Sequence, residues 1–292
     1  MAVVTHDFQK EILDAMKDYS SLARPVKASF LERMLIEKAP VSKLHPNPDD
    51  EFTNPEIGPN YEIVGNYVDS IVAYDKYSKV PKIEPLIVEK ISTGGYMILN
   101  GHHRWLAVKR LNMKYIPIHI VNPTHEADIL TTMKKLNSTR CVSFDLDEVL
   151  IGNGDTFEVE SLRFPANKIF TMPVRKNAAL LISALQEMGF DIWVYTGSYY
   201  TPQFVKMTFK MHKAKIDGVI TGMNRTQFTP AIKDTFRKKY NTVVHIDNER
   251  LMWVNSKTKD FDSYELPQDE KWASASVDYV REIIKSGKVT DA

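Results

Sequence analysis

Three short apolar runs in the C-terminal half of the chain each end in polar side chains, and this pattern limits the fold more than any other feature. The first run, Cys141–Phe144, ends in Asp145 and Asp147. Such a run is typical of a buried strand in a parallel sheet, where residues two apart share a face. Open α/β sheets bind their ligands at that strand end. Two clustered carboxylates repel unless a cation lies between them, so the run predicts a Mg²⁺ site; the alternative is an acidic turn without function.

The other two runs extend the pattern. Phe190–Tyr195 ends in Thr196-Gly197-Ser198, and Thr242–Ile246 ends in Asp247-Asn248. Lys233 lies in the amphipathic segment 229–240, before the third run. A hydroxyl and a flexible backbone can hold a phosphate oxygen, a lysine and a metal ion can neutralise charge, and one carboxylate can attack. The three runs together predict metal-assisted phosphoryl transfer, although Lys233 alone could be a solvated lysine and Thr196–Ser198 an ordinary turn.

These segments resemble the four ordered motifs of the haloacid dehalogenase (HAD) superfamily, most closely its small-capped branch, which includes phosphatases of the RNA polymerase II tail. The similarity covers about residues 139–270. It implies an α/β fold, namely a HAD-like Rossmannoid domain with a parallel sheet. The sequence departs from the motifs at Val149, where a threonine is commoner, and at Asn248, where many members have a second aspartate.

The resemblance also implies roles for six residues. Asp145 would be the nucleophile that forms an aspartyl-phosphate, and Asp147 would be the general acid and then the general base. Thr196 and Lys233 would hold the phosphoryl group, beside the backbone of Gly197. The Mg²⁺ ion would be bound by Asp145, Asp147 and Asp247.

A second pattern lies in the N-terminal half. Asn100-Gly101-His102-His103-Arg104 follows the strand-like segment Tyr96–Leu99 and opens a predicted helix. A glycine at a strand-to-helix turn, followed by donors in the first helical turn, is typical of an anion site, because backbone N–H groups, the helix dipole and cationic side chains converge there. We therefore expect these five residues to bind a phosphate; the alternative is a polar cap with a solvated arginine. Adjacent histidines on a helix point about 100° apart, which disfavours a shared metal ion.

This pattern is similar to the ParB/sulfiredoxin-like α+β fold, over about residues 38–122, through Pro85–Val88, Ile98–Val108 and Ile116–Ile118. The Gly-His-His-Arg form is closest to the free serine kinase branch. The resemblance implies a bound ATP or ADP and a glutamate base, for which Glu51 is the better candidate and Glu56 the alternative.

Three departures qualify this second resemblance. Asn100 stands where such kinases usually have aspartate, and His102 stands where sulfiredoxins have their catalytic cysteine. The Gly101–Arg104 box also differs from that of partition proteins, which argues against their DNA-clamp chemistry. The domain is therefore either a kinase or only a nucleotide- or nucleic-acid-binding module.

Composition agrees with a two-domain cytoplasmic protein. The chain has 292 residues, 43% of them hydrophobic, and a formal net charge of +1, which gives no overall bias toward nucleic acid or membrane. The one cysteine, Cys141, allows no internal disulfide and is expected to be a small core residue. No apolar stretch approaches the roughly 20 residues of a bilayer-spanning helix, and the N-terminus lacks a signal-peptide pattern.

The expected organisation is five segments: N-terminal helices at 1–37, a ParB/sulfiredoxin-like domain at 38–124, a linker helix at 125–138, a HAD-like domain at 139–270, and a C-terminal helix at 271–292. The N-terminal helices would pack on the next domain or form an oligomer contact. Because 151–190 leaves no room for a large cap, the HAD-like site would be open to its phosphorylated substrate: a nucleic-acid end, a phosphoprotein or a small molecule.

Overall fold

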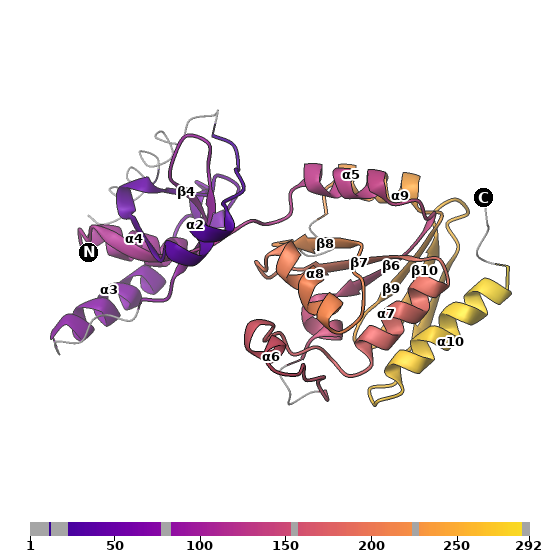
Figure 1. The fold of residues 1–292 in the computed structure, drawn as a ribbon. Helices are drawn as coiled ribbons and strands as arrows, with labels where there is room; N and C mark the ends of the chain where they lie inside the picture. Colours follow the sequence, from indigo (N-terminus) through magenta and orange to yellow (C-terminus); the bar gives the residue numbers. More distant parts are fainter. Residues whose placement is uncertain (1–11, 13–22, 77–82, 153–156, 224–227, 288–292) are drawn as a thin grey trace. The chain divides into compact units, whose positions relative to one another are not determined.

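The structure is a computed structural model that describes residue 12 and residues 23–76, 83–152, 157–223 and 228–287. The chain divides into two compact units, Met1–Asn122 and Pro123–Ala292, each with its own sheet and core (Figure 1). In the described part, every helix is too short or too polar to cross a membrane. The α/β fold class is confirmed, because both units combine helices with sheets.

The first unit contains a five-stranded mixed sheet in the order β1-β5-β3-β4-β2. Its strands are β1 (Lys38–Pro40), β2 (Leu44–Pro46), β3 (Leu86–Lys90), β4 (Tyr96–Asn100) and β5 (Tyr115–Val121). Its helices are α2 (Phe30–Leu35), α3 (Tyr61–Lys76) and α4 (His102–Arg110), with the 3₁₀ turns η1 (Val41–Lys43) and η2 (Glu51–Thr53). Leu86 and Val88 of β3 pack with Trp105 and Leu106 of α4 and Val64 of α3 to form the core.

The turn η1 separates the two short strands β1 and β2. β1 pairs with β5 and β2 pairs with β4, at opposite edges of the sheet. Five strands spaced about 4.8 Å apart would separate flat edges by roughly 19 Å, whereas the four residue steps from Pro40 to Leu44 reach at most about 14 Å. The sheet must therefore curl so that its two edges approach each other.

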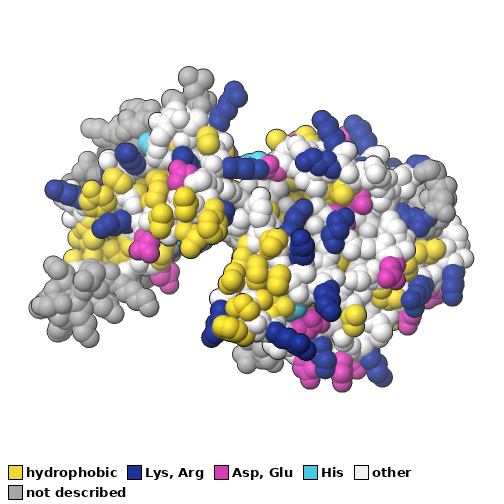
Figure 2. Space-filling model, in the orientation of Figure 1, with side chains coloured by type: hydrophobic (Ala, Val, Ile, Leu, Met, Phe, Trp, Pro, Cys, Tyr) yellow, Lys and Arg dark blue, Asp and Glu magenta, His cyan; other side chains and the backbone are white. Residues whose placement is uncertain are grey.

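Only part of the predicted N-terminal helices lies within the described residues. The predicted first helix lies outside the described residues except for Ile12. The second forms as α2, whose N-terminus has a capping box between Ser29 and Glu32. Its large apolar side chains are exposed by 59 to 73%, namely Phe30, Leu31, Met34 and Leu35. Figure 2 shows hydrophobic side chains gathered over this part of the first unit. The oligomer contact stays a prediction.

The second unit contains a six-stranded sheet in the order β11-β10-β9-β6-β7-β8. Its strands are β6 (Arg140–Asp145), β7 (Asp191–Thr196), β8 (Gly218–Thr221), β9 (Thr242–Ile246), β10 (Arg250–Asn255) and β11 (Phe261–Glu265). Its helices are α5 (Glu126–Lys135), the π-helical turn η3 (Leu146–Leu150), α6 (Ala166–Ile169), α7 (Ala178–Glu187), α8 (Pro202–Met211), α9 (Pro230–Lys239) and α10 (Trp272–Lys285).

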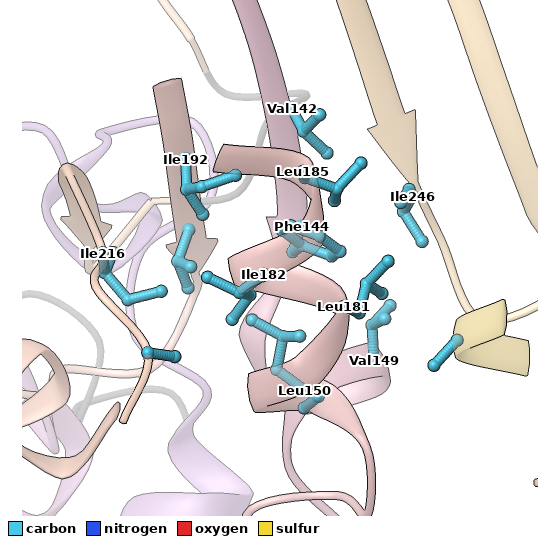
Figure 3. Packing of buried hydrophobic residues seen from close by; sticks show 14 of the residues in the cluster. Val142, Phe144, Val149, Leu150, Leu181, Ile182, Leu185, Ile192, Ile216 and Ile246 are labelled. Atoms are coloured by element: carbon cyan, nitrogen blue, oxygen red, sulfur yellow. The ribbon is translucent and has the colours of Figure 1, made fainter. Parts of the chain in front are cut away.

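Alternation along β6 assigns its side chains to the two faces of this sheet. Val142 and Phe144 point into the larger core, against Leu181 and Leu185 of α7 (Figure 3). Helix α10 contributes Val280 to the same core. On the other face, α5 and α9 cover Trp193, Cys141 and their neighbours. Cys141 is fully buried, as expected of a small core residue, and as the single cysteine of the chain it forms no internal disulfide.

The sheet differs from the predicted parallel sheet at one edge. Strands β9, β6, β7 and β8 are parallel, but β10 and β11 add an antiparallel hairpin. The predicted linker helix at 125–138 corresponds to α5, which contacts α9 and β8 and so packs within the second unit. Helix α10 occupies the predicted C-terminal segment.

Candidate functional site

The first candidate site lies at the carboxyl edge of the second sheet, where β6 ends at Asp145. The next five residues form the π-helical turn η3, and Asp145 Oδ1 accepts a hydrogen bond from the Glu148 N–H at 3.0 Å. Single π-helical turns are rare and are found frequently at functional sites. This turn carries Asp147 to the end of the neighbouring strand β7.

Three hydroxyl groups surround the carboxylate of Asp147. Its Oδ2 accepts hydrogen bonds from the hydroxyls of Thr196 and of Ser198, the latter at 3.2 Å. The Ser198 N–H donates to Thr196 Oγ1 at 2.9 Å, and the Tyr200 hydroxyl also bonds Asp147. Thr196 is completely buried, so its hydroxyl has a fixed position. The edge therefore combines two carboxylates with oriented hydroxyl groups, as the motif spacing predicts for Asp145, Asp147 and Thr196.

Burial raises the pKa of Asp145 to about 6, and the charges of Glu148 and Asp147 act in the same direction, against the hydrogen bond from the Glu148 N–H. A carboxyl group with this pKa is mostly ionised at neutral pH, which a nucleophilic carboxylate requires. The repulsion between Asp145 and Asp147 is the condition that a cation would relieve.

The predicted metal ligands are brought together only in part. Asp145 and Asp147 interact electrostatically, whereas Asp247 Oδ1 accepts a hydrogen bond from the N–H of Asn248 at 2.8 Å. Within the described residues, no group of three or more His, Cys, Asp or Glu side chains is placed to hold a metal ion. Mg²⁺ is usually held by one or two carboxylates and several waters, so the Asp145 and Asp147 pair fits this ion.

Lys233 lies in the first turns of α9, which Thr229 caps through a bond to the Ile232 N–H. Among the residues that the structure describes, no ion pair joins Lys233 to Asp145 or Asp147. Lys233 instead lines a groove of about 760 Å³ on the α9 face of the sheet, here named the sheet groove. The groove is lined by Cys141, Ser143, Trp193, Val194, Tyr195, Ile220, Phe228, Lys233, Phe236, Arg237, Val243, Val254, Asn255, Ser256 and Lys259.

The second candidate site is the turn that opens α4. His102 is buried, its Nε2 accepts a hydrogen bond from the Asn47 N–H at 3.1 Å, and its Nδ1 lies 3.6 Å from Asp50 Oδ2. His103 Nε2 accepts from the Asn60 N–H at 2.9 Å. Burial lowers the pKa of His102 to about 4, against the charge of Asp50, and lowers the pKa of His103. At neutral pH both imidazoles are therefore uncharged, and the Nε2 atom of each accepts a backbone hydrogen bond and is not available as the anion donor that the sequence pattern suggested.

An aromatic ring closes the loop over this histidine pair. The Phe52 ring stacks on His102 with centroids 5.2 Å apart and meets His103 edge-on at the same distance. The Thr53 hydroxyl bonds the carbonyl of Asn47, which folds the loop upon itself. The histidines therefore fasten 47–60 to α4, which gives them a structural task that residue type alone does not reveal.

Asn100, Gly101 and Arg104 form the other side of the turn. Arg104 Nη1 donates to Glu84 Oε2 at 3.0 Å, and Nη2 donates to Asn100 Oδ1 at 3.1 Å. Gly101 has a φ of 99°, and a Cβ there would lie 2.6 Å from Leu86 Cδ2, so only glycine fits. These side chains hold the turn, and an anion would meet the backbone N–H groups at the start of α4, which no side chain caps.

Two residues at these sites are missed by the sequence patterns. Asp50, not the predicted Glu51, faces His102, whereas Glu51 is exposed at the start of η2. Asp50 accepts from the Phe52 N–H at 2.9 Å, and this Asp-x-Phe cap is the signal that could have found it. Tyr200 follows the Thr196–Ser198 motif, but the motif itself gives no reason to choose it.

The first part of the chain matches a known family. Residues 27–135 match the family model of the ParB N-terminal domain. The N-terminal part of the chain is therefore a ParB-like domain, although the last residues of the match, in α5, pack within the second unit. This match confirms the ParB part of the predicted resemblance, and it extends beyond residues 38–122 at both ends. The match stops at residue 135, so the HAD resemblance of the second unit stays a prediction.

Two solved structures are similar to part of the chain, and both are of the C-terminally truncated chromosome-partitioning protein ParB from Caulobacter crescentus. The complex with CTP-gamma-S is 26% identical, with 32% of this chain and 47% of that chain covered and a TM-score of 0.24. The complex with the centromeric parS site is 22% identical, with 34% and 46% covered and a TM-score of 0.23. The chain thus spans less than half the length of either protein. The search of curated proteins found no match.

Proposed function

We propose that this protein is a Mg²⁺-dependent phosphomonoesterase whose active site is the carboxyl edge of the second sheet, combined with a ParB-like domain that binds a nucleotide or nucleic acid. The observation that carries the proposal is the meeting of Asp145 and Asp147 with the Thr196 and Ser198 hydroxyls at one strand edge. Asp147 is exposed but is bonded by the two hydroxyls, and burial raises the pKa of Asp145 to about 6, neither of which a chance acidic turn would need.

The reaction has two steps. Asp145 attacks phosphorus, a bond forms from its oxygen to phosphorus as the ester bond breaks, and Asp147 gives its proton to the leaving alcohol. Water then attacks the aspartyl-phosphate, its proton passes to Asp147, and Asp145 is released with inorganic phosphate. Thr196 and the Gly197 backbone would orient the phosphoryl oxygens, and Lys233 would approach them from α9.

Asp145 and Asp147 would hold the Mg²⁺ ion, with Asp247 as a candidate third ligand. When bound, the ion would neutralise negative charge on the phosphoryl oxygens.

The proposal is tested by Mg²⁺-dependent phosphate release from mononucleotides, 5′- and 3′-phosphorylated oligonucleotides, phosphoserine and phosphopeptides. Asp145→Asn should lower turnover by more than about 10³-fold, because the nucleophile is lost. The matched control is Asp278→Asn, an exposed carboxylate on α10. Circular dichroism should show that both variants stay folded. Wild-type turnover in Asp145→Asn would refute the mechanism.

The ParB-like domain is better explained as a binding module than as a kinase. Its family match and the CTP-gamma-S complex of the similar ParB protein favour a nucleotide ligand. A kinase using ATP or ADP would need a base near the bound hydroxyl, and the predicted Glu51 is exposed and is not the carboxylate that faces the histidine pair.

Nucleotide binding is tested by calorimetry with CTP, ATP and ADP. We expect His103→Ala to weaken binding roughly tenfold, because the Asn60 N–H loses its acceptor and the loop over α4 is released. His119→Gln on β5, an exposed histidine of the same unit, is the matched control. Equal affinity in wild type and His103→Ala would remove the case for a nucleotide site at this turn.

A further inference from the structure

The sheet groove is a second feature of the second unit that the phosphatase reaction does not explain. Its volume of about 760 Å³ lies in the range of small-molecule sites, roughly 300–1,000 Å³. It exists because α5 and α9 cover only part of their face of the sheet, so that residues of β9 and β10 stay partly open beside α9.

The walls of the groove are cationic. Lys233 and Arg237 are one turn apart on α9 and share a face, and Lys259, which follows β10, also lines the groove. All three are exposed, and none of the described lining residues is acidic. In the described part of the chain these three cations form no ion pair, unlike the neighbouring Lys238, whose Nζ lies 2.6 Å from Asp234 Oδ2. The groove therefore offers unneutralised positive charge to a ligand.

The groove also offers aromatic surface. Phe228 and Phe236 are partly buried and stack on each other with centroids 6.1 Å apart. Tyr195 lies beside them, and its hydroxyl is 2.8 Å from His245 Nε2. Cationic and aromatic side chains along one groove are the combination by which proteins hold single-stranded nucleic acid, because the cations meet phosphates while the bases stack on the rings.

The groove runs along β6 toward the carboxyl edge of the sheet, where Asp145 lies. Cys141, Ser143 and Asp145 are alternate residues of β6, so their side chains share one face of the strand, and the first two line the groove. Asn255 and Ser256 lie at the other end, where β10 pairs with the start of β9. A strand lying in the groove would thus point one end toward Asp145.

We propose that the sheet groove binds a single-stranded oligonucleotide and directs its terminal phosphate to Asp145. The use of the bound strand as substrate rests on the proposed phosphatase function, whereas its binding does not.

Binding is therefore measured with the full-length Asp145→Asn chain. The probe is a labelled oligodeoxythymidine of 12 nucleotides with a 5′- or 3′-phosphate, and its fluorescence anisotropy reports the bound fraction. The double variant Arg237→Gln/Lys259→Gln should bind about tenfold more weakly at 0.1 M salt. Its plot of log affinity against log salt should be shallower by about 1.4, because each phosphate contact to a single strand contributes about 0.7. Lys238→Gln, on the same helix but outside the groove, should bind as the parent does.

The difference between variants is the deciding quantity, because the ParB-like domain could also bind the strand. A second measurement locates the contact: the oligonucleotide should protect Lys259, but not Lys238, from acetylation as read by mass spectrometry. Equal affinity and slope in the double variant and the parent would overturn the inference. Tighter binding of an acidic phosphopeptide with the same dependence on Arg237 and Lys259 would overturn it too.

The two proposals fail separately. If no phosphate ester is hydrolysed in a manner that depends on Asp145, the phosphatase proposal fails, while anisotropy in the Asp145→Asn chain still decides whether the groove binds the strand. If the double variant binds like its parent, the groove inference fails and hydrolysis of mononucleotides still tests the phosphatase.

Discussion

The two candidate sites start from the same local design but differ in charge: the histidines of the first are neutral, whereas the second holds two adjacent carboxylates. Each places polar residues where a strand passes into a helical turn, at Asn100–Arg104 in the first unit and at Asp145–Asp147 in the second. In the first, the side chains bond backbone groups and one another, so they hold the turn together. In the second, two carboxylates remain close together at a strand edge and burial raises the pKa of one of them. Residue type therefore suggests a site, but the hydrogen-bond partners decide which groups stay available for chemistry.

The largest expected effect tests whether Asp147 is the proton donor of the second site. Asp147→Asn should lower hydrolysis of alkyl phosphates roughly 10²- to 10⁴-fold, the range for loss of a general acid. Hydrolysis of an aryl phosphate, whose leaving group needs no proton, should fall much less. Because Asp147 also accepts the proton of water in the second step, the ratio is measured from release of the alcohol or phenol in the first turnover, at saturating Mg²⁺. Equal losses would mean that Asp147 does not act as an acid. Its role would then be to hold the turn, as the side chains of the first site do.

A smaller effect concerns the acid stability of the first unit. The folded state lowers the pKa of His102 to about 4 from an ordinary value near 6.5. Neutral His102 therefore contributes stability that is present above pH 6.5 and is lost as pH falls toward 4, by about 3 kcal/mol in total. Urea unfolding at several pH values should show this loss in the wild type and a weaker one in His102→Gln. His119→Gln should keep the wild-type profile; the same profile in His102→Gln would contradict the assignment.

The smallest effect has the opposite sign and belongs to the second unit. The folded pKa of Asp145 is raised to about 6, so the group contributes stability below its unfolded pKa near 4 that is lost as pH rises through 6. Asp145→Asn should flatten this part of the profile, and Asp278→Asn should not. Solvent screening reduces the effect, because Asp145 is only partly buried. A profile in Asp145→Asn that falls as steeply as in the wild type would show that Asp145 is not desolvated.

Much of the fold could be predicted because its signals are local. The structure contains the elements predicted from the apolar runs at β6, β7 and β9 and from the glycine before α4. Their boundaries agree with the prediction to about one residue. Helix α3, the hairpin β10–β11 and the turn η1 were not predicted. Strand pairing and the direction of the chain at a sheet edge depend on contacts far apart in sequence, such as Lys38 with Pro117.

Of the candidate sites, the sequence by itself determined the chemical groups and their order: two aspartates after one strand, a threonine after the next, and a glycine followed by two histidines. Only the tertiary structure decided what those groups face. Asp50 lies beside His102, and Asp147 accepts a hydrogen bond from the Thr196 hydroxyl. Lys233, Arg237 and Lys259 line the same groove. The physical reason is that a covalent neighbour fixes position along the chain, whereas burial and hydrogen bonding depend on residues that folding brings in from elsewhere.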